Sequence, residues 1–163
     1  MKTIILFRHG KSDWKANFYQ DLDRPVSNRG IKAAKLMGIY LHEINNIPDL
    51  VISSPAVRAY DTAQLAISSG EWNRKLNLDQ NLYGATPEIV MNILCNQDDK
   101  YDSICITGHE PTMSLFINKY TDSGYQKFPT ATMARIDFFT NNWCNVARSK
   151  INLCWLTRPK ELV

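Results

Sequence analysis

"KTIILF", residues 2–7, is a nearly unbroken apolar run that ends at Arg8, His9 and Gly10. A run without polar alternation is typical of a strand buried on both faces of a parallel sheet. It therefore predicts a central strand covered by helices on either side. A strand end that reaches solvent also explains a polar residue after such a run, so the meaning of this tripeptide depends on the rest of the chain.

The remaining chain alternates between helical and strand patterns. Apolar residues within 27–45 recur every three or four positions, as on the buried face of a helix. Ser54 and Pro55 are typical of an N-cap and a first helical position. The predicted elements are strands over 2–7, 49–54, 101–107, 131–139 and 144–157 and helices over 27–45, 54–66, 86–94 and 110–120. This order predicts an α/β fold over residues 1–163 as a single domain, with three α/β/α layers, a largely parallel central sheet and antiparallel strands from the tail.

Composition and charge limit the classes of function. The chain has 163 residues, a formal net charge of +3 and a hydrophobic content of 44%, which is ordinary for a globular protein. Lys and Arg are spread along the sequence, so nucleic acid is not an expected partner. No apolar run is long enough to cross a membrane and the N-terminus lacks a signal-peptide cleavage site, so we expect a cytoplasmic protein.

The cysteines show no metal-binding spacing. Cys95, Cys105, Cys144 and Cys154 contain no CxxC pair, and three of them lie in apolar stretches. We therefore expect buried reduced thiols, and neither disulfides nor a zinc site. No metal and no cofactor are expected.

Three strand ends carry residues suited to phosphate chemistry: Arg8 and His9, Arg58, and His109. In an open α/β sheet, ligands bind at the carboxyl ends of the strands, which meet at one edge. Arg matches phosphate oxygens with a planar fork, and a neutral imidazole can attack phosphorus. Gly10 lets the backbone approach closely. The sequence therefore predicts a phosphate site with a histidine nucleophile at this edge.

Each of these residues has a simpler explanation when it is taken alone. Arg8 is then a surface charge, Arg58 a solvated helix residue and His109 a polar loop residue. Two of the three histidines fall at equivalent strand ends, however, and this agreement favours the site. His42 lies in the middle of a predicted helix and is expected to be structural or exposed.

Three motifs in this order resemble those of the histidine phosphatase (phosphoglycerate mutase-like) superfamily. "RHG" at 8–10 is similar to its first signature, "SSPAVRAYDTA" at 53–63 to its second, and "GHEP" at 108–111 to its late Gly-His motif. "DLDRPVSNRG" at 21–30 and "LYGATPEIV" at 82–90 are similar to segments of the SixA-type phosphohistidine phosphatases. The resemblance extends over essentially the whole chain.

This resemblance implies a fold, an activity and a set of roles. The implied fold is a minimal phosphoglycerate mutase-like domain without a large inserted subdomain, and the implied activity needs no metal. His9 becomes the nucleophile that is phosphorylated. Arg8, Arg58 and His109 form the positive pocket around the phosphoryl group.

Two positions depart from the SixA-type pattern. Val26 stands where Leu is usual, and Glu110 stands where Asn is more common. A carboxylate at position 110 opposes an incoming phosphate electrostatically. Arg24 is either a further anion contact or the partner of Asp21 or Asp23 in an ion pair.

The substrates that such a site could accept differ in whether their leaving group needs a proton donor. An alkoxide needs a proton in the transition state, whereas an imidazole, with a pKa of about 6.5, departs readily. A chain with little room for an inserted acid therefore suits phosphohistidine on a protein, including histidine-containing phosphotransfer proteins. Glu88 and Glu110 are the first candidate proton donors, followed by Asp21 and Asp23.

Two other functions stay open from the sequence. One is a broad or small-molecule phosphomonoesterase of the same superfamily, and the other is a phosphate-binding adaptor without turnover. The nucleophile favours catalysis, because a binding module needs the arginines but not His9. For catalysis we expect a protonated His109 and a backbone carbonyl, from Gly10 or a neighbour, that fixes the tautomer of His9. The oligomeric state and the order of the edge strands stay open.

Overall fold

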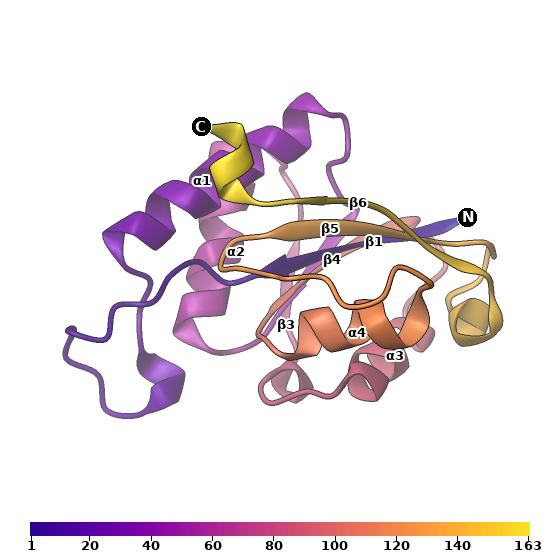
Figure 1. Ribbon diagram of the computed structural model, residues 1–163, viewed down its shortest axis with the longest axis horizontal. Coiled ribbons are helices and arrows are strands. Elements are labelled where there is room, and N and C mark those ends of the chain that lie inside the picture. Colours follow the sequence, from indigo (N-terminus) through magenta and orange to yellow (C-terminus); the bar gives the residue numbers. More distant parts are fainter.

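The centre of the computed structural model, which describes residues 1–163, is a six-stranded sheet (Figure 1). Its strands in chain order are β1 (Lys2–Arg8), β2 (Leu50–Ser53), β3 (Leu76–Leu78), β4 (Ser103–Gly108), β5 (Met133–Phe138) and β6 (Ile151–Thr157). They lie in the order β3-β2-β4-β1-β5-β6. Strands β3, β2, β4 and β1 pair with one another in parallel. Strand β5 pairs antiparallel with β1, and β6 pairs antiparallel with β5. The predicted α/β class with a largely parallel sheet is confirmed.

The sheet differs from the prediction in two places. The short strand β3 is not predicted, because three residues carry no periodic pattern. The tail segment 144–157 is not one strand: its first half forms a 3-10 helix, η3 (Trp143–Arg148), and only the second half joins the sheet. The prediction of a strand over the whole segment is therefore wrong, and the two tail strands form one antiparallel edge.

Helices cover both faces of the sheet (Figure 1). One face is covered by α1 (Asn28–Glu43) and α2 (Val57–Ser69), and the other by α3 (Pro87–Cys95) and α4 (Thr112–Tyr120). Three further 3-10 helices are η1 (Asp21–Asp23), η2 (Gln80–Leu82) and η4 (Pro159–Leu162). None of the helices has the length and apolar character to pass through a membrane.

Capping residues decide where the helices begin. The hydroxyls of Ser27 and Thr86 each accept a hydrogen bond from a first-turn N–H, of α1 and α3 respectively. Helix α2 begins later than predicted, because its N-cap is Ala56 and its first residue is Val57. The prediction of Ser54 as the cap is wrong: its hydroxyl accepts the N–H of Ala56, which precedes the first turn of α2, at 3.3 Å.

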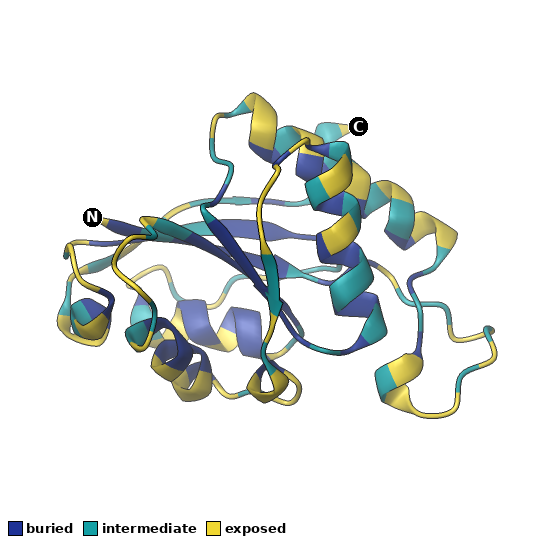
Figure 2. Ribbon diagram, turned by 180° about the vertical axis from the view of Figure 1, so that it is seen from behind, coloured by how far each residue is buried: buried dark blue, intermediate teal, exposed yellow.

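Alternate side chains of β1 enter two different cores. Ile4 and Leu6 pack with the residues of α3 and α4, and Ile5 and Phe7 pack with those of α1 and α2. All four are buried, as the dark blue central strands of Figure 2 show. Because successive side chains of a strand point to opposite faces, a sheet between two helical layers requires an apolar residue at every position. Residues 4–7 of the run "KTIILF" meet this requirement.

Helices α1 and α2 meet at two glycines. A Cβ added to Gly38 would lie 2.3 Å from the carbonyl oxygen of Ala66, and one added to Gly70 would lie 2.3 Å from the carbonyl oxygen of Gly38. No larger residue fits at either position unless the helices move apart. This contact sets the spacing of the two helices whose first turns carry Gly30 and Arg58.

The cysteines are less buried than predicted. Cys105 is buried in β4, whereas Cys95 is half-buried. The prediction is wrong for Cys144 and Cys154, which are exposed, in η3 and on the open side of the edge strand β6. All four thiols are free, and no group of three or more His, Cys, Asp or Glu side chains is placed to hold a metal ion.

Candidate active site

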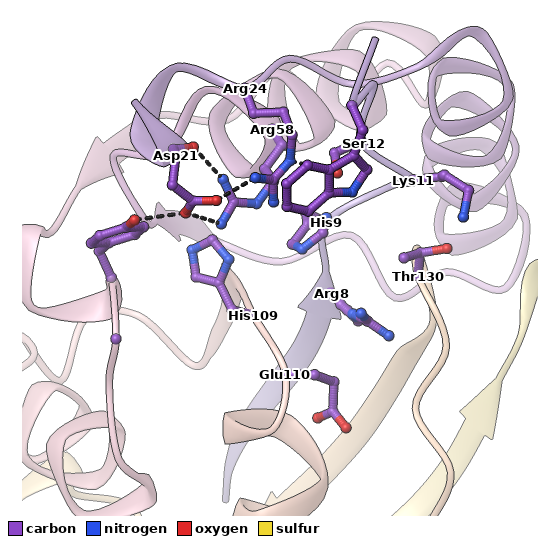
Figure 3. Close-up of a pocket in the computed structure, with 13 residues that line it drawn as sticks. Arg8, His9, Lys11, Ser12, Asp21, Arg24, Arg58, His109, Glu110 and Thr130 are labelled. Atoms are coloured by element: carbon purple, nitrogen blue, oxygen red, sulfur yellow. Dashed lines mark hydrogen bonds and ion pairs between the residues drawn. The ribbon is translucent and has the colours of Figure 1, made fainter. Parts of the chain in front are cut away.

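The carboxyl ends of β1, β2 and β4 open into a pocket of about 550 Å³ (Figure 3). The parallel register sets Arg8 beside Gly108, so the segments after these two strands leave the sheet at the same edge. The structure brings the four predicted side chains together: Arg8, His9, Arg58 and His109 all line this pocket.

His9 is held by the main chain at the end of β1. Its Nδ1 lies 2.7 Å from the carbonyl oxygen of Gly10. Because a carbonyl only accepts, Nδ1 carries the proton and Nε2 keeps its lone pair. Burial above all, and then the charges of Arg58 and Arg8, lowers the pKa of His9 to about 4. The side chain is therefore a neutral imidazole at neutral pH, with the unprotonated nitrogen that a nucleophile needs.

Gly10 fixes the position of this carbonyl. Its N–H donates to Oγ1 of Thr62 at 2.9 Å, on the first half of α2. A Cβ at Gly10 would lie 2.8 Å from the carbonyl oxygen of Gly30, in the first turn of α1. The absence of a side chain thus allows the β1 end to lie directly against both helices.

Arg58 is held by a carboxylate from the η1 segment. Its Nη1 donates to the backbone oxygen of Asp21 at 2.7 Å and its Nη2 to Oδ2 of the same residue at 2.9 Å. The hydroxyl of Tyr83 donates to that Oδ2 at 2.7 Å, and Arg24 forms an ion pair with Oδ1. The hydrogen bond from Tyr83 first, and then those from Arg24 and Arg58, hold the pKa of Asp21 far below its usual value. Asp21 is therefore ionised, and its prediction as a candidate proton donor is wrong.

Arg24 is buried at the rim of the pocket. Its Nε donates to Oγ of Ser12 at 2.9 Å, and its guanidinium carbon lies 3.7 Å from the ring centroid of Trp14. Of the two roles that the sequence left open, the ion pair with Asp21 is formed. The side chain also lines the pocket, so the ion pair does not remove it from the site.

His109 faces His9 across the pocket, with the two ring centroids 5.3 Å apart. Its Nε2 lies 2.8 Å from Oγ of Ser54, the hydroxyl that does not cap α2. Burial first, and then His9 and Arg58, lowers the pKa of His109 to about 3. The ring is therefore neutral at neutral pH, because a buried imidazole beside a guanidinium does not readily take up a further positive charge. A protonated His109 during phosphoryl transfer stays a prediction.

Arg8 and Arg58 both keep a buried N–H without a partner. Arg8 donates through Nη1 to the carbonyl oxygen of Phe128 at 2.9 Å, but its Nε has no hydrogen-bond partner, and neither has Nε of Arg58. Burial lowers the pKa of Arg8, and the nearby Glu110 opposes this effect. A buried donor without a partner is costly, so both guanidinium groups are suited to an anion in the pocket.

The other candidate proton donors fall in different places. Glu110 lines the pocket, where its Oε1 accepts a backbone N–H of α4 at 2.7 Å. Glu88 lies on α3 in an exposed ion pair with Lys119, and Asp23 is exposed on η1. Neither Glu88 nor Asp23 lines the pocket, so their prediction as donors is wrong. The carboxylate of Glu88 is neutralised on the protein surface instead.

Trp14, Tyr83 and Ser54 contact residues of the site but were not predicted to belong to it, although Ser54 and Tyr83 lie within two of the quoted motifs. Tyr83 and Ser54 reach their partners across 62 and 55 positions of sequence, and such contacts leave no local pattern. Ser54 had one signal, since it follows a parallel strand at the edge where ligands bind. Its neighbour Pro55 instead favoured the interpretation as a helix cap.

Residues 4–83 match the family model of the histidine phosphatase superfamily, branch 1. An uncharacterized protein of Mycobacterium tuberculosis is 32% identical over 152 residues, which are 85% of this chain and 90% of that protein. The chain belongs to the histidine phosphatase superfamily. A 2,3-bisphosphoglycerate-dependent phosphoglycerate mutase of Mycobacterium leprae is 37% identical over 90 residues, 51% of this chain. The aligned part spans only 36% of that mutase, so the chain matches about a third of its length.

Solved structures of SixA proteins share the fold. The putative phosphohistidine phosphatase SixA of Nakamurella multipartitia superposes with a TM-score of 0.86 at 20% identity, over 97% of this chain and 96% of that one. The protein histidine phosphatase SixA complexed with tungstate gives 0.84 at 18% identity, over 99% of both chains. The predicted phosphoglycerate mutase-like fold without a large insert is therefore confirmed.

Proposed function

We propose that this protein is a phosphatase that removes the phosphoryl group from phosphohistidine on a protein, through a phosphorylated His9. The observation that carries the proposal is the state of His9. Its Nδ1–H is bound to the carbonyl of Gly10 and its pKa is about 4, so its Nε2 is unprotonated in a pocket walled by Arg8 and Arg58. A phosphate-binding module has no need of such a nitrogen. The SixA structures, at 18% to 23% identity, support the fold through their superposition, and the chemistry rests on the site.

In the first step the phosphoryl group moves to the enzyme. Nε2 of His9 attacks phosphorus as the bond between phosphorus and the substrate imidazole nitrogen breaks. The leaving nitrogen keeps the electron pair and takes a proton from water. Arg8 and Arg58 donate to the nonbridging oxygens, where charge is stabilised in phosphoryl transfer. A bound dianion also favours a proton on His109, so that its ring donates to the same oxygens.

In the second step water attacks phosphorus of the phosphorylated His9. The N–P bond breaks, inorganic phosphate leaves with the oxygen of water, and the electron pair returns to Nε2. The proton lost by the water passes to solvent or to the phosphate. The proposed substrate is a phosphorylated protein, and histidine-containing phosphotransfer proteins belong to this class. We also propose that residues 1–163 act as one domain around a single sheet.

A second candidate function is a small-molecule phosphomonoesterase. The position of Glu110 favours it, because this carboxylate lines the pocket and an alkoxide leaving group needs an acid. A phosphohistidine substrate does not need that acid. The two functions therefore differ in how far turnover depends on Glu110.

The decisive experiment combines turnover with trapping of the intermediate. Phosphate release is measured from a phosphohistidine peptide and from sugar phosphates, and the acid-labile phosphoenzyme is mapped by mass spectrometry under neutral conditions. We expect release from the peptide and a phosphoryl group on His9. The variant His9→Gln should lose both, whereas His42→Gln, which changes an exposed imidazole outside the pocket, should lose neither. Full activity of His9→Gln would contradict the nucleophile, and a preference for sugar phosphates would favour the esterase.

A further inference from the structure

A second hollow lies next to the active-site pocket and shares a wall with it. Its volume is about 250 Å³, and Lys11 and Thr130 line both hollows. Figure 3 shows these two residues together at the side of the pocket away from Asp21. A chain that leaves the pocket on this side therefore enters the second hollow directly.

The second hollow is lined by basic side chains and by no acidic one. These basic residues, which we call the cationic groove, are Lys11, Arg29, Lys127, Arg158 and Lys160. They come from four separate segments of the chain: the loop after β1, the first turn of α1, the loop before β5, and the region of η4. Of the five, Arg158 alone has an ion-pair partner, which is Glu161. The groove therefore holds several positive charges that the protein does not neutralise.

We propose that the cationic groove binds a carboxylate-rich segment next to the phosphorylated residue of a protein substrate. This inference rests on the proposed function. The groove adjoins the pocket through Lys11, so a substrate chain with its phosphoryl group at His9 can occupy both. Complementary charge of this kind favours both encounter and register between two proteins.

The exposure of these cations favours an extended acidic chain over a compact second phosphate. Lys11, Arg29, Lys127 and Lys160 are all exposed, so their long side chains can follow carboxylates at different spacings. A built phosphate subsite would instead have buried donors fixed by neighbours, as Arg58 is in the pocket. The pocket wall also includes Trp14, which is 69% exposed. Exposed Trp is typical of surfaces that contact proteins.

A pair of phosphohistidine peptides tests the groove. The peptides have the same sequence except that three Glu residues beside the phosphohistidine in one are Gln in the other, and phosphoramidate serves as a small donor without a flank. We expect the wild-type protein to have a kcat/KM about tenfold higher for the acidic peptide, since several exposed ion pairs each contribute modestly. Raising the salt concentration should reduce this ratio.

Two charge-reversal variants distinguish binding in the cationic groove from an effect of the overall net charge. The variant Lys127→Glu/Lys160→Glu changes two groove residues outside the active-site pocket, and its ratio between the peptides should fall to about one. The control Lys100→Glu/Lys150→Glu changes two exposed lysines that precede β4 and β6, at the opposite edge of the sheet. It has the same net charge and should keep the wild-type ratio.

The other possible results of this experiment contradict either the groove proposal or the proposed function. Turnover of both peptides at equal kcat/KM by the wild-type protein would overturn the groove and leave the proposed function intact. An equal loss of the ratio in the control variant would overturn it too, because net charge would then explain the preference. Equal rates together with binding of a single-stranded RNA would replace the acidic protein by a nucleic acid. No turnover of either peptide or of phosphoramidate would contradict the proposed function itself.

Discussion

Acidification should leave His9 neutral well below the pH at which a free imidazole takes up its proton. At pH 5.5, a histidine with an ordinary pKa of about 6.5 is about one-tenth neutral. His9, with a pKa of about 4, is almost fully neutral at that pH. The difference between the two pKa values corresponds to about 3 kcal/mol in favour of the neutral ring. Burial is the main cause of the lowered pKa of His9, and the nearby guanidinium groups lower it further. The hydrogen bond to the Gly10 carbonyl acts in the opposite direction and raises the pKa.

NMR spectroscopy of the protein labelled with ¹⁵N-histidine measures this directly. The chain has three histidines, so His42→Gln and His109→Gln variants assign the signals. We expect His9 to keep a protonated Nδ1 and an unprotonated Nε2 from pH 8 to pH 5. The acid limb of kcat/KM for the phosphohistidine peptide should follow the same pKa.

Removal of one positive charge next to His9 tests the physical cause of its lowered pKa. Arg58→Met should raise the pKa of His9, but not to its ordinary value, because burial is the larger effect. Arg148→Met, which removes an exposed charge on η3, should leave it unchanged. Titration of wild-type His9 near pH 6.5, or a proton on Nε2 at neutral pH, would refute the reasoning that the fold prepares this nucleophile.

Three further changes test the packing, the anchor of Arg58 and the proton linkage. Gly38→Ala should lower the free energy of unfolding in urea by about 1–3 kcal/mol, because the new Cβ meets Ala66; a gain, as in an ordinary helix interior, would contradict this. Asp21→Asn should reduce kcat/KM about tenfold, because Arg58 loses a charged anchor; an unchanged rate would show that Arg58 is held by other contacts. Between pH 6.5 and pH 4, His9 is protonated in the unfolded chain but neutral in the folded protein. The free energy of unfolding therefore decreases by about 1.4 kcal/mol for each unit by which the pH is lowered, as far as this residue contributes. His9→Gln should remove that part of the slope, as measured by urea unfolding at several pH values.

The fold was predictable where each segment is long enough to show its period. The run "KTIILF" predicted a central strand because both faces of β1 are buried, and the predicted helices over 27–45 and 86–94 begin within one residue of α1 and α3. Strand β3 has three residues and is defined by its pairing with β2, so no local pattern predicts it. The region of η3 contains strand-forming residues, of which Trp143 and Val146 are buried in the core next to α3 and do not extend β6.

The site was predictable in its members but not in its electrostatics. Arg8, His9, Arg58 and His109 follow from topology, because parallel strand ends share one edge. The neutral state of His109 depends on burial, which the sequence does not report. Asp21 was a weak candidate donor from its position alone. Its role as the anchor of Arg58 depends on the hydroxyl of Tyr83, 62 residues away, and on a loop that brings the two together.

The atom that orients His9 belongs to the main chain, and this has a consequence for protein engineering. No point substitution can delete the carbonyl oxygen of Gly10. Its direction can be altered only through what supports it, which is the hydroxyl of Thr62 and the tight contact with Gly30. Attempts to retune the reactivity of the imidazole should therefore target Thr62, where exchange of a hydroxyl for a methyl group would release the loop and preserve every side chain that lines the pocket.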